Sequence, residues 1–288
     1  MLGAMIGDIC GSVYEWTNEK DIRRIELFKE GCRPTDDSVM TAAVARAFMD
    51  ARGKSSRTIK EVLVNSMHYY GRLFPGAGYG STFANWLRTY ERRPYNSWGN
   101  GSAMRVSAIG WLYDSLEETL NAAALSTQVT HNHPEGIRGA QAIAAAIYLA
   151  RNGRSKKEIR EYVEKNFYRL DFTLDDIRRD YTFDVSCRGS CPQAIEAFLE
   201  GDSFEGVILK AISVGGDSDT IAAMAGGIAE AFYGIPEDIE KKAFTILVNT
   251  RYKGSVYPYS VLAEEVLRFR AYIGRSDSFG ENRARITG

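Results

Sequence analysis

The sequence predicts a single all-α domain. Apolar residues recur at helical spacing through most of the 288 residues, whereas the alternation typical of half-buried strands is poor everywhere. The stretch 169–185 is the least helical part of the chain, and it too lacks a clear strand pattern. No internal repeat, low-complexity block or Pro/Gly/Ser-rich linker divides the sequence, so a two-domain organisation is not favoured.

Nine segments carry the helical pattern, and glycines mark several of their ends. Gly153, Gly201 and Gly234 stand where C-caps are expected. The glycine-containing segment 7–15 is expected to be a gap between helices. We expect one domain over residues 1–273, followed by a polar tail over 274–288. The predicted helices cover 38–51, 56–70, 117–129, 136–149, 156–166, 192–199, 204–214, 220–233 and a segment that begins at Pro236.

Composition excludes several classes of protein. The 36 Lys and Arg nearly balance the 37 Asp and Glu, so no bulk positive charge exists to hold nucleic acid or an anionic membrane. No apolar run approaches the roughly 18 residues that a membrane helix needs. The apolar N-terminus lacks a preceding basic residue and runs into Asp8, which argues against a signal peptide. Four cysteines are too few for a disulfide framework, so we expect buried thiols and a cytoplasmic location.

Two helix entrances are unusually rich in carboxylates and hydroxyls. Thr35-Asp36-Asp37-Ser38 opens one helix, and Gly215-Gly216-Asp217-Ser218-Asp219-Thr220 opens another. Helix capping explains either cluster alone, because Ser, Thr and Asp are preferred N-caps. Together they hold more carboxylates than capping needs, and adjacent carboxylates repel each other unless a cation lies between them. The all-oxygen donor set favours Mg²⁺ or Mn²⁺, and two facing clusters could hold two ions.

Two glycine-rich loops and a histidine pair offer further candidates. The loops 76–81 and 99–103 present unhindered backbone N–H groups that suit a phosphate, although such loops are more often simple turns. Arg105 suits a diphosphate, with a surface salt bridge slightly favoured over that role. His133 is expected to cap the helix that starts at Pro134, whereas His131 is the candidate to face a cleft.

Taken together, these motifs resemble the ADP-ribosylglycohydrolase family, which includes the dinitrogenase reductase-activating glycohydrolase and the vertebrate ADP-ribosylhydrolases. The resemblance runs from Leu2 to the helix after Pro236. Its most specific part is the pair of acidic clusters, where Ser218 stands for a threonine that is more usual in the family. In chain order the motifs are Gly7-Asp8 through Glu15, Thr35 to Ser38, Gly78-Tyr79-Gly80, Gly99 to Arg105, Thr130-His131 and Gly215 to Thr220.

The resemblance implies an orthogonal helical bundle with a binuclear Mg²⁺ centre at helix N-termini. The metal ligands it implies are Thr35, Asp36, Asp37, Asp217, Asp219 and Thr220. Glu15, Asp36 and Asp219 would take the most direct part in catalysis, with the Glu15 loop lying over the ions. The substrate contacts it implies are Gly78, Tyr79, Gly80, Ser81, Gly99, Asn100, Gly101, Ser102, Ala103 and His131.

The activity that the resemblance implies is hydrolysis of the bond between the anomeric carbon of ADP-ribose and an acceptor. The partner would be an ADP-ribosylated protein or small conjugate, and nucleic acid would bind only as a modified substrate. Glu15 would serve as general acid/base or as a gate. Without the resemblance, Glu15 would be interpreted as a solvated carboxylate at a helix end. The acceptor linkage stays open among arginine, serine, nucleic acid and acetyl ester. The alternative is a non-catalytic, crystallin-like member that only binds ADP-ribose; the complete set of acidic residues argues against it.

Overall fold

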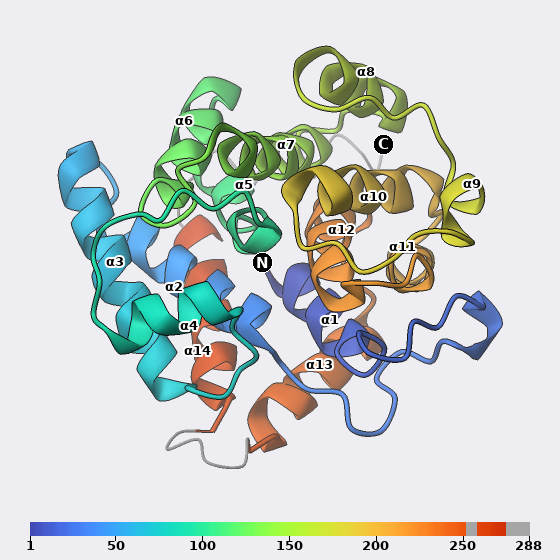
Figure 1. Cartoon of the computed structure of the whole chain (residues 1–288), viewed down its shortest axis with the longest axis horizontal. Helices are drawn as coiled ribbons and strands as arrows, with labels where there is room; N and C mark the ends of the chain where they lie inside the picture. The colour runs from blue at the N-terminus through green and yellow to red at the C-terminus, as the bar shows by residue number, and fades with distance from the viewer. Residues whose placement is uncertain (252–257, 275–288) are drawn as a thin grey trace.

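The computed structural model describes residues 1–251 and 258–274, and its regular elements are all helices (Figure 1). Within these residues no strand forms, and Gly99 and Ser186 make an isolated β-bridge. The predicted all-α class is therefore confirmed. The elements are α1 Leu2–Gly11, η1 Ile22–Arg24, α2 Asp36–Asp50, α3 Ser56–Leu73, α4 Ser81–Arg88, η2 Asn100–Ser102, α5 Ile109–Leu112, α6 Leu116–Thr127, α7 Pro134–Arg151, α8 Lys156–Asn166, α9 Leu174–Arg178, α10 Cys187–Glu200, α11 Phe204–Ser213, α12 Ser218–Tyr233, α13 Glu237–Asn249 and α14 Ser260–Gly274.

All nine predicted helices form, most within about two residues of the predicted ends, whereas α1, α4, α5, α9 and α14 were not predicted. Helix α10 begins five residues before its predicted start at Pro192. Gly153 and Gly234 have the left-handed conformation expected after a helix, with φ of 73° and 74°. Gly201 is the C-cap of α10, as expected, but its backbone is extended, with φ of −71°, and not left-handed. Its lack of a side chain instead leaves room for Val207, whose Cγ2 would lie 2.4 Å from an added β-carbon.

The centre of the bundle is the pair α1 and α12 (Figure 1). All ten residues of α1 are buried, as are the first twelve residues of α12, Ser218 to Ala229. Helices α7, α10 and α11 pack against α12, while α2 joins the pair through α1 and is covered by α3 and α14. The two helices that begin with acidic clusters, α2 and α12, therefore both contact the same central helix.

A stripe of glycines lets α1 and α12 approach at backbone distance. Gly3, Gly7 and Gly11 lie four residues apart and share one face of α1. An added β-carbon at Gly7 would lie 2.0 Å from the carbonyl oxygen of Ala222, and one at Gly11 would lie 2.4 Å from the Cα of Asp219. The segment 7–15 was expected to be a gap between helices, which is wrong for residues 7–11. These glycines serve helix packing, because no larger side chain fits between the two backbones.

Three further expectations concern the chain as a whole. All four cysteines are free, and Cys10, Cys187 and Cys191 are buried, as expected for structural thiols. No helix among the described residues combines the length and apolar character needed to cross a membrane. The polar tail was expected from residue 274, but Gly274 is the last residue of α14. The rest of that tail, 275–288, lies outside the described residues.

We predict that Gly7→Ala lowers the free energy of unfolding by about 3 kcal/mol, because the added methyl group forces two packed backbones apart. Urea denaturation measures this change. Gly274→Ala is the control, since an added β-carbon there meets nothing within 4 Å. A Gly7→Ala protein as stable as the control would show that the two helices do not depend on this close approach.

Candidate active site

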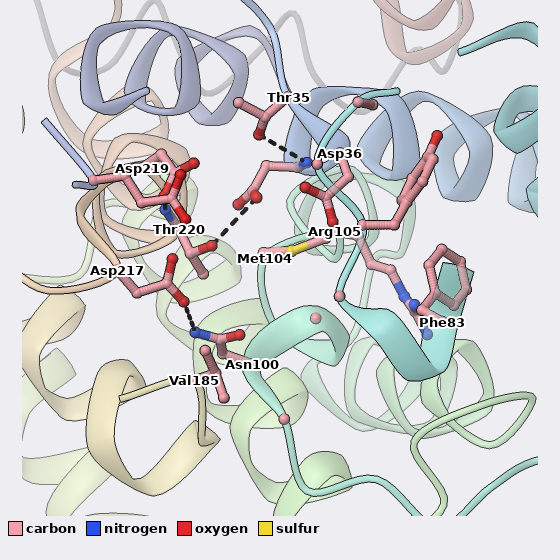
Figure 2. A pocket seen from close by; sticks show the side chains of 18 of the residues that line it. Thr35, Asp36, Phe83, Asn100, Met104, Arg105, Val185, Asp217, Asp219 and Thr220 are labelled. Atoms are coloured by element: carbon pink, nitrogen blue, oxygen red, sulfur yellow. Dashed lines mark hydrogen bonds between the residues drawn. The ribbon is translucent and has the colours of Figure 1, made fainter. Parts of the chain in front are cut away.

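The two acidic helix entrances meet in space (Figure 2). Thr220 at the start of α12 donates its hydroxyl to Oδ2 of Asp37 in α2, at 3.2 Å. Carboxylate oxygens of Asp8, Asp37 and Asp219 lie within 4.8 Å of one another, and so do those of Glu15, Asp217 and Asp219. Segments almost two hundred residues apart in the sequence thus bring their oxygen atoms to one place, as the predicted ligand set requires.

Asp8 of α1 holds the start of α2 in position. Its Oδ2 accepts from the backbone N–H groups of Thr35 at 2.9 Å and Ser38 at 3.0 Å, and from the hydroxyl of Ser38. Its Oδ1 accepts from the hydroxyl of Thr35 at 2.6 Å. Asp8 is fully buried. The sequence analysis included Asp8 in a motif but assigned no role to it. A carboxylate within an apolar stretch could have indicated one, because a buried carboxylate is costly unless it has bonding partners.

Capping accounts for only part of the acidic clusters. The hydroxyl of Thr35 accepts from the N–H of Asp37 at 3.4 Å, a capping contact. Asp217 is the N-cap of α12, yet its side chain caps nothing and instead accepts from Nδ2 of Asn100 at 2.7 Å. Oδ1 of Asp37 is buried, with no hydrogen-bond partner among the described residues. An unpartnered buried carboxylate oxygen beside several others fits a cation, and the donor set is all oxygen.

The electrostatics of the cluster point the same way. Burial first, and then the neighbouring carboxylates Asp8 and Asp217, raise the pKa of Asp36 to about 8. Burial likewise raises the pKa values of Asp37 and Asp219 well above the ordinary value. These carboxylates are costly to ionise together without a counter-charge, and a divalent cation supplies one.

A cavity of about 570 Å³ opens over the cluster. Its wall contains every predicted metal ligand, and Glu15 lies there as well. Ser102 and Ala103 are the predicted substrate contacts that do not reach it. Both are fully buried behind the loop, where the hydroxyl of Ser102 donates to the carbonyl oxygens of Gly99 and Gly136. The predicted substrate contacts in the wall are Gly78, Tyr79, Gly80, Ser81, Gly99, Asn100, Gly101 and His131.

Arg105 differs from the favoured prediction. A surface salt bridge was expected, but the side chain is 1% exposed, lines the cavity and makes no ion pair in the part of the chain that the structure describes. Burial lowers its pKa to about 10, so it is still a cation at neutral pH. His131 also lines the cavity, as expected. His133 caps α7 as predicted, with Nδ1 accepting from the N–H of Glu135 at 3.1 Å.

The mouth of the cavity carries an aromatic pair that was not predicted. The rings of Trp16 and Phe183 stack with centroids 5.4 Å apart and planes inclined by 17°. Both residues line the cavity, and Trp16 is 79% exposed. The sequence offered one signal, a tryptophan directly after the candidate Glu15. Its partner comes from the irregular stretch before α10, whose position the sequence could not give.

The chain belongs to the ADP-ribosylglycohydrolase family, whose model matches residues 1–252. It is 26% identical to the ADP-ribosylhydrolase ARH3 of Bos taurus, over 82% of this chain and 84% of that protein. It is also 26% identical to the ADP-ribosylarginine hydrolase Tri1 of Pseudomonas putida, over 85% of this chain and 73% of that protein.

A solved structure described as an ADP-ribosylglycohydrolase-related protein complex has the same fold, with a TM-score of 0.66 and 18% identity over 94% of this chain and 97% of that one. The family membership confirms the predicted enzyme class, an ADP-ribosyl hydrolase. Hydrolytic removal of ADP-ribose from a substrate is the activity of this class.

We predict that metal-free protein loses stability as the pH rises from about 5 to about 8. The folded chain keeps a proton on Asp36, with a pKa of about 8, that the unfolded chain releases near 3.8. The folded state therefore binds more protons in this window, and its stability falls with increasing pH. Thermal unfolding in EDTA at several pH values measures the trend, and added Mg²⁺ should abolish it. A melting temperature that rises with pH in EDTA would contradict this account.

Proposed function

We propose that the protein is a divalent-cation-dependent hydrolase that cleaves the glycosidic bond between ADP-ribose and an acceptor, with two Mg²⁺ ions as the preferred cofactor and Mn²⁺ as a substitute. The observation that supports this most strongly is the meeting of the two acidic helix entrances in one cavity wall. The side chains that would hold the ions are Thr35, Asp36, Asp37, Asp217, Asp219 and Thr220. When bound, such ions fix ribose hydroxyls and lower the pKa of a water molecule.

Glu15 is proposed as the general acid/base. Its carboxylate lies within 4.8 Å of ligand oxygens of Asp217 and Asp219 and is half-buried at the cavity mouth. From there it can take a proton from the attacking water or give one to the leaving group of an oxocarbenium-like transition state. A gate that moves when substrate arrives is the second role that the position of Glu15 allows. Asp36 and Asp219 would assist catalysis by binding the ions that hold the ribose.

The glycine loops are proposed to hold the diphosphate and the distal ribose. Helix α4 begins at Ser81 after Gly80, an N-cap without a side chain, so its first N–H groups have no side-chain cap. Gly78 adopts a φ of 114°, which a larger residue rarely reaches, and an added β-carbon would lie 3.2 Å from Oδ1 of Asp36. Backbone amides at a helix start beside the acidic cluster suit a phosphate group that is attached to the ribose held by the ions.

The acceptor is proposed to enter past the aromatic pair at the mouth, since Trp16 directly follows Glu15. The relatives differ in name, one being called an ADP-ribosylarginine hydrolase, so arginine, serine, nucleic-acid and acetyl-ester linkages all belong in a substrate panel. Crystallin-like binding without catalysis is the alternative function. The complete acidic set and Glu15 favour catalysis, because binding alone does not need a buried carboxylate cluster that is costly to maintain.

We predict that the protein releases free ADP-ribose from at least one member of that panel, and that EDTA stops the release. Asp219→Ala should lower turnover by about 100-fold or more, the loss expected when a metal site is disturbed. Quantifying ADP-ribose by chromatography measures both effects. Asp238→Ala, which removes an exposed carboxylate from the first turn of α13, is the matched control. Near-normal turnover of Asp219→Ala in Mg²⁺ would contradict the proposed site.

We predict that Glu15→Gln binds ADP-ribose but turns over substrate about 100-fold more slowly or worse, because an amide cannot transfer the proton. Calorimetric titration with ADP-ribose separates binding from turnover. Glu19→Gln, four residues along the same loop, is the control for a change of charge near the mouth. If Glu15→Gln turned over at the rate of the control, Glu15 would have no part in the chemistry.

A further inference from the structure

A hydrogen-bonded chain of three side chains links two residues of the cavity wall, Arg105 and His131, through the buried Thr130. Nη2 of Arg105 donates to Oγ1 of Thr130 at 2.8 Å and to the carbonyl oxygen of Ser126 at 3.3 Å. The same Thr130 oxygen lies 2.8 Å from Nδ1 of His131. Arg105 and Thr130 are 1% and 0% exposed, so water does not reach the middle of the chain.

The direction of each hydrogen bond follows from counting protons. A guanidinium only donates, so the hydroxyl oxygen of Thr130 accepts from Arg105. The hydroxyl proton then needs an acceptor, and Nδ1 of His131 is the one within reach among the described residues. If Nδ1 carried a proton instead, the buried hydroxyl proton would have no partner, which is unfavourable. Nδ1 of His131 therefore accepts, and the proton of the neutral ring sits on Nε2.

The protonated nitrogen faces the second glycine loop. Nε2 of His131 would lie 3.1 Å from an added β-carbon at Gly101 and 3.6 Å from one at Gly99. Both glycines line the cavity together with His131. The missing side chains leave the Nε2–H group open to a ligand that lies along this loop.

Arg105 adds a positive charge behind this donor. It forms no ion pair within residues 1–251 and 258–274, and its Nε has no hydrogen-bond partner there. Burial, followed by the charge of Arg105, lowers the pKa of His131 well below its usual range, so the ring is neutral at neutral pH. A buried cation without a carboxylate, next to a fixed N–H donor, suits an anionic oxygen in the cavity.

We infer that Arg105 and Thr130 are positioning residues that fix His131 as its Nε2–H tautomer, so that this ring donates a hydrogen bond to a phosphate oxygen of ADP-ribose. The choice of ADP-ribose as ligand rests on the proposed function. The tautomer does not, because it follows from the hydrogen bonds of the ligand-free chain.

The first test is the tautomer itself. The protein contains three histidines, so ¹⁵N-labelled imidazoles give a simple long-range ¹H–¹⁵N spectrum, and His131→Gln identifies the His131 signals. In the wild-type protein we expect an unprotonated Nδ1 and a protonated Nε2 at His131. Thr130→Val should give a mixture of tautomers at this residue alone, and Thr130→Ser should recover the wild-type pattern. A protonated Nδ1 in the wild-type protein overturns the inference, whether or not Thr130→Val folds.

The second test is affinity for ADP-ribose, measured by calorimetry. Thr130→Val should raise Kd about tenfold, as expected for a weakened hydrogen bond to a charged group, and Thr130→Ser should restore most of the affinity. Thr119→Val removes an equally buried hydroxyl in α6, outside the cavity wall, and should leave Kd and the His131 signals unchanged. An unchanged Kd in Thr130→Val overturns the positioning role. If wild-type protein fails to bind ADP-ribose, the proposed function fails, while the spectrum still decides the tautomer.

Discussion

The close approach of α1 and α12 is the constraint on which the rest of the structure depends. The glycine stripe on α1 lets it lie against the backbone of α12, and Gly11 touches the very turn that carries Asp219. From the same α1, Asp8 reaches across to the first turn of α2 and binds its N–H groups and hydroxyls. One short buried helix therefore fixes two helix entrances relative to each other, and the acidic site is a consequence of that packing.

The clustering of carboxylates at two adjacent helix starts has an electrostatic cost. Burying several carboxylates in one cluster raises their pKa values and opposes their joint ionisation. The helix starts moderate the cost, because free N–H groups and the positive end of a helix favour negative charge. They do not remove it, and one oxygen of Asp37 stays without a hydrogen bond in the described structure. A site built this way is suited to divalent cations and to the ribose hydroxyls that such ions hold.

The sequence predicted nine of the helices and the acidic motifs, because both leave a local signature. Amphipathic spacing marks α3 and α8, which each bury one side, whereas α1 is buried on every side and has no polar face to give it a period. Because α1 is buried on every side, its sequence pattern did not reveal the role of Asp8, and Gly7 and Gly11 were interpreted as loop residues. Arg105 was misread for a related reason, since charge in a sequence does not tell whether the side chain meets water. Phe183 could not be assigned to the mouth, because its place depends on how a segment without regular structure packs against Gly216 and Trp16.

Anomalous scattering from crystals soaked in Mn²⁺ tests the central claim most directly. If α1 brings the two helix entrances together as a metal centre, the anomalous map will show two peaks between the carboxylates of Asp36 and Asp37 on α2 and those of Asp217 and Asp219 on α12. A map without a peak among these four side chains, at a Mn²⁺ concentration that supports turnover, would contradict the account.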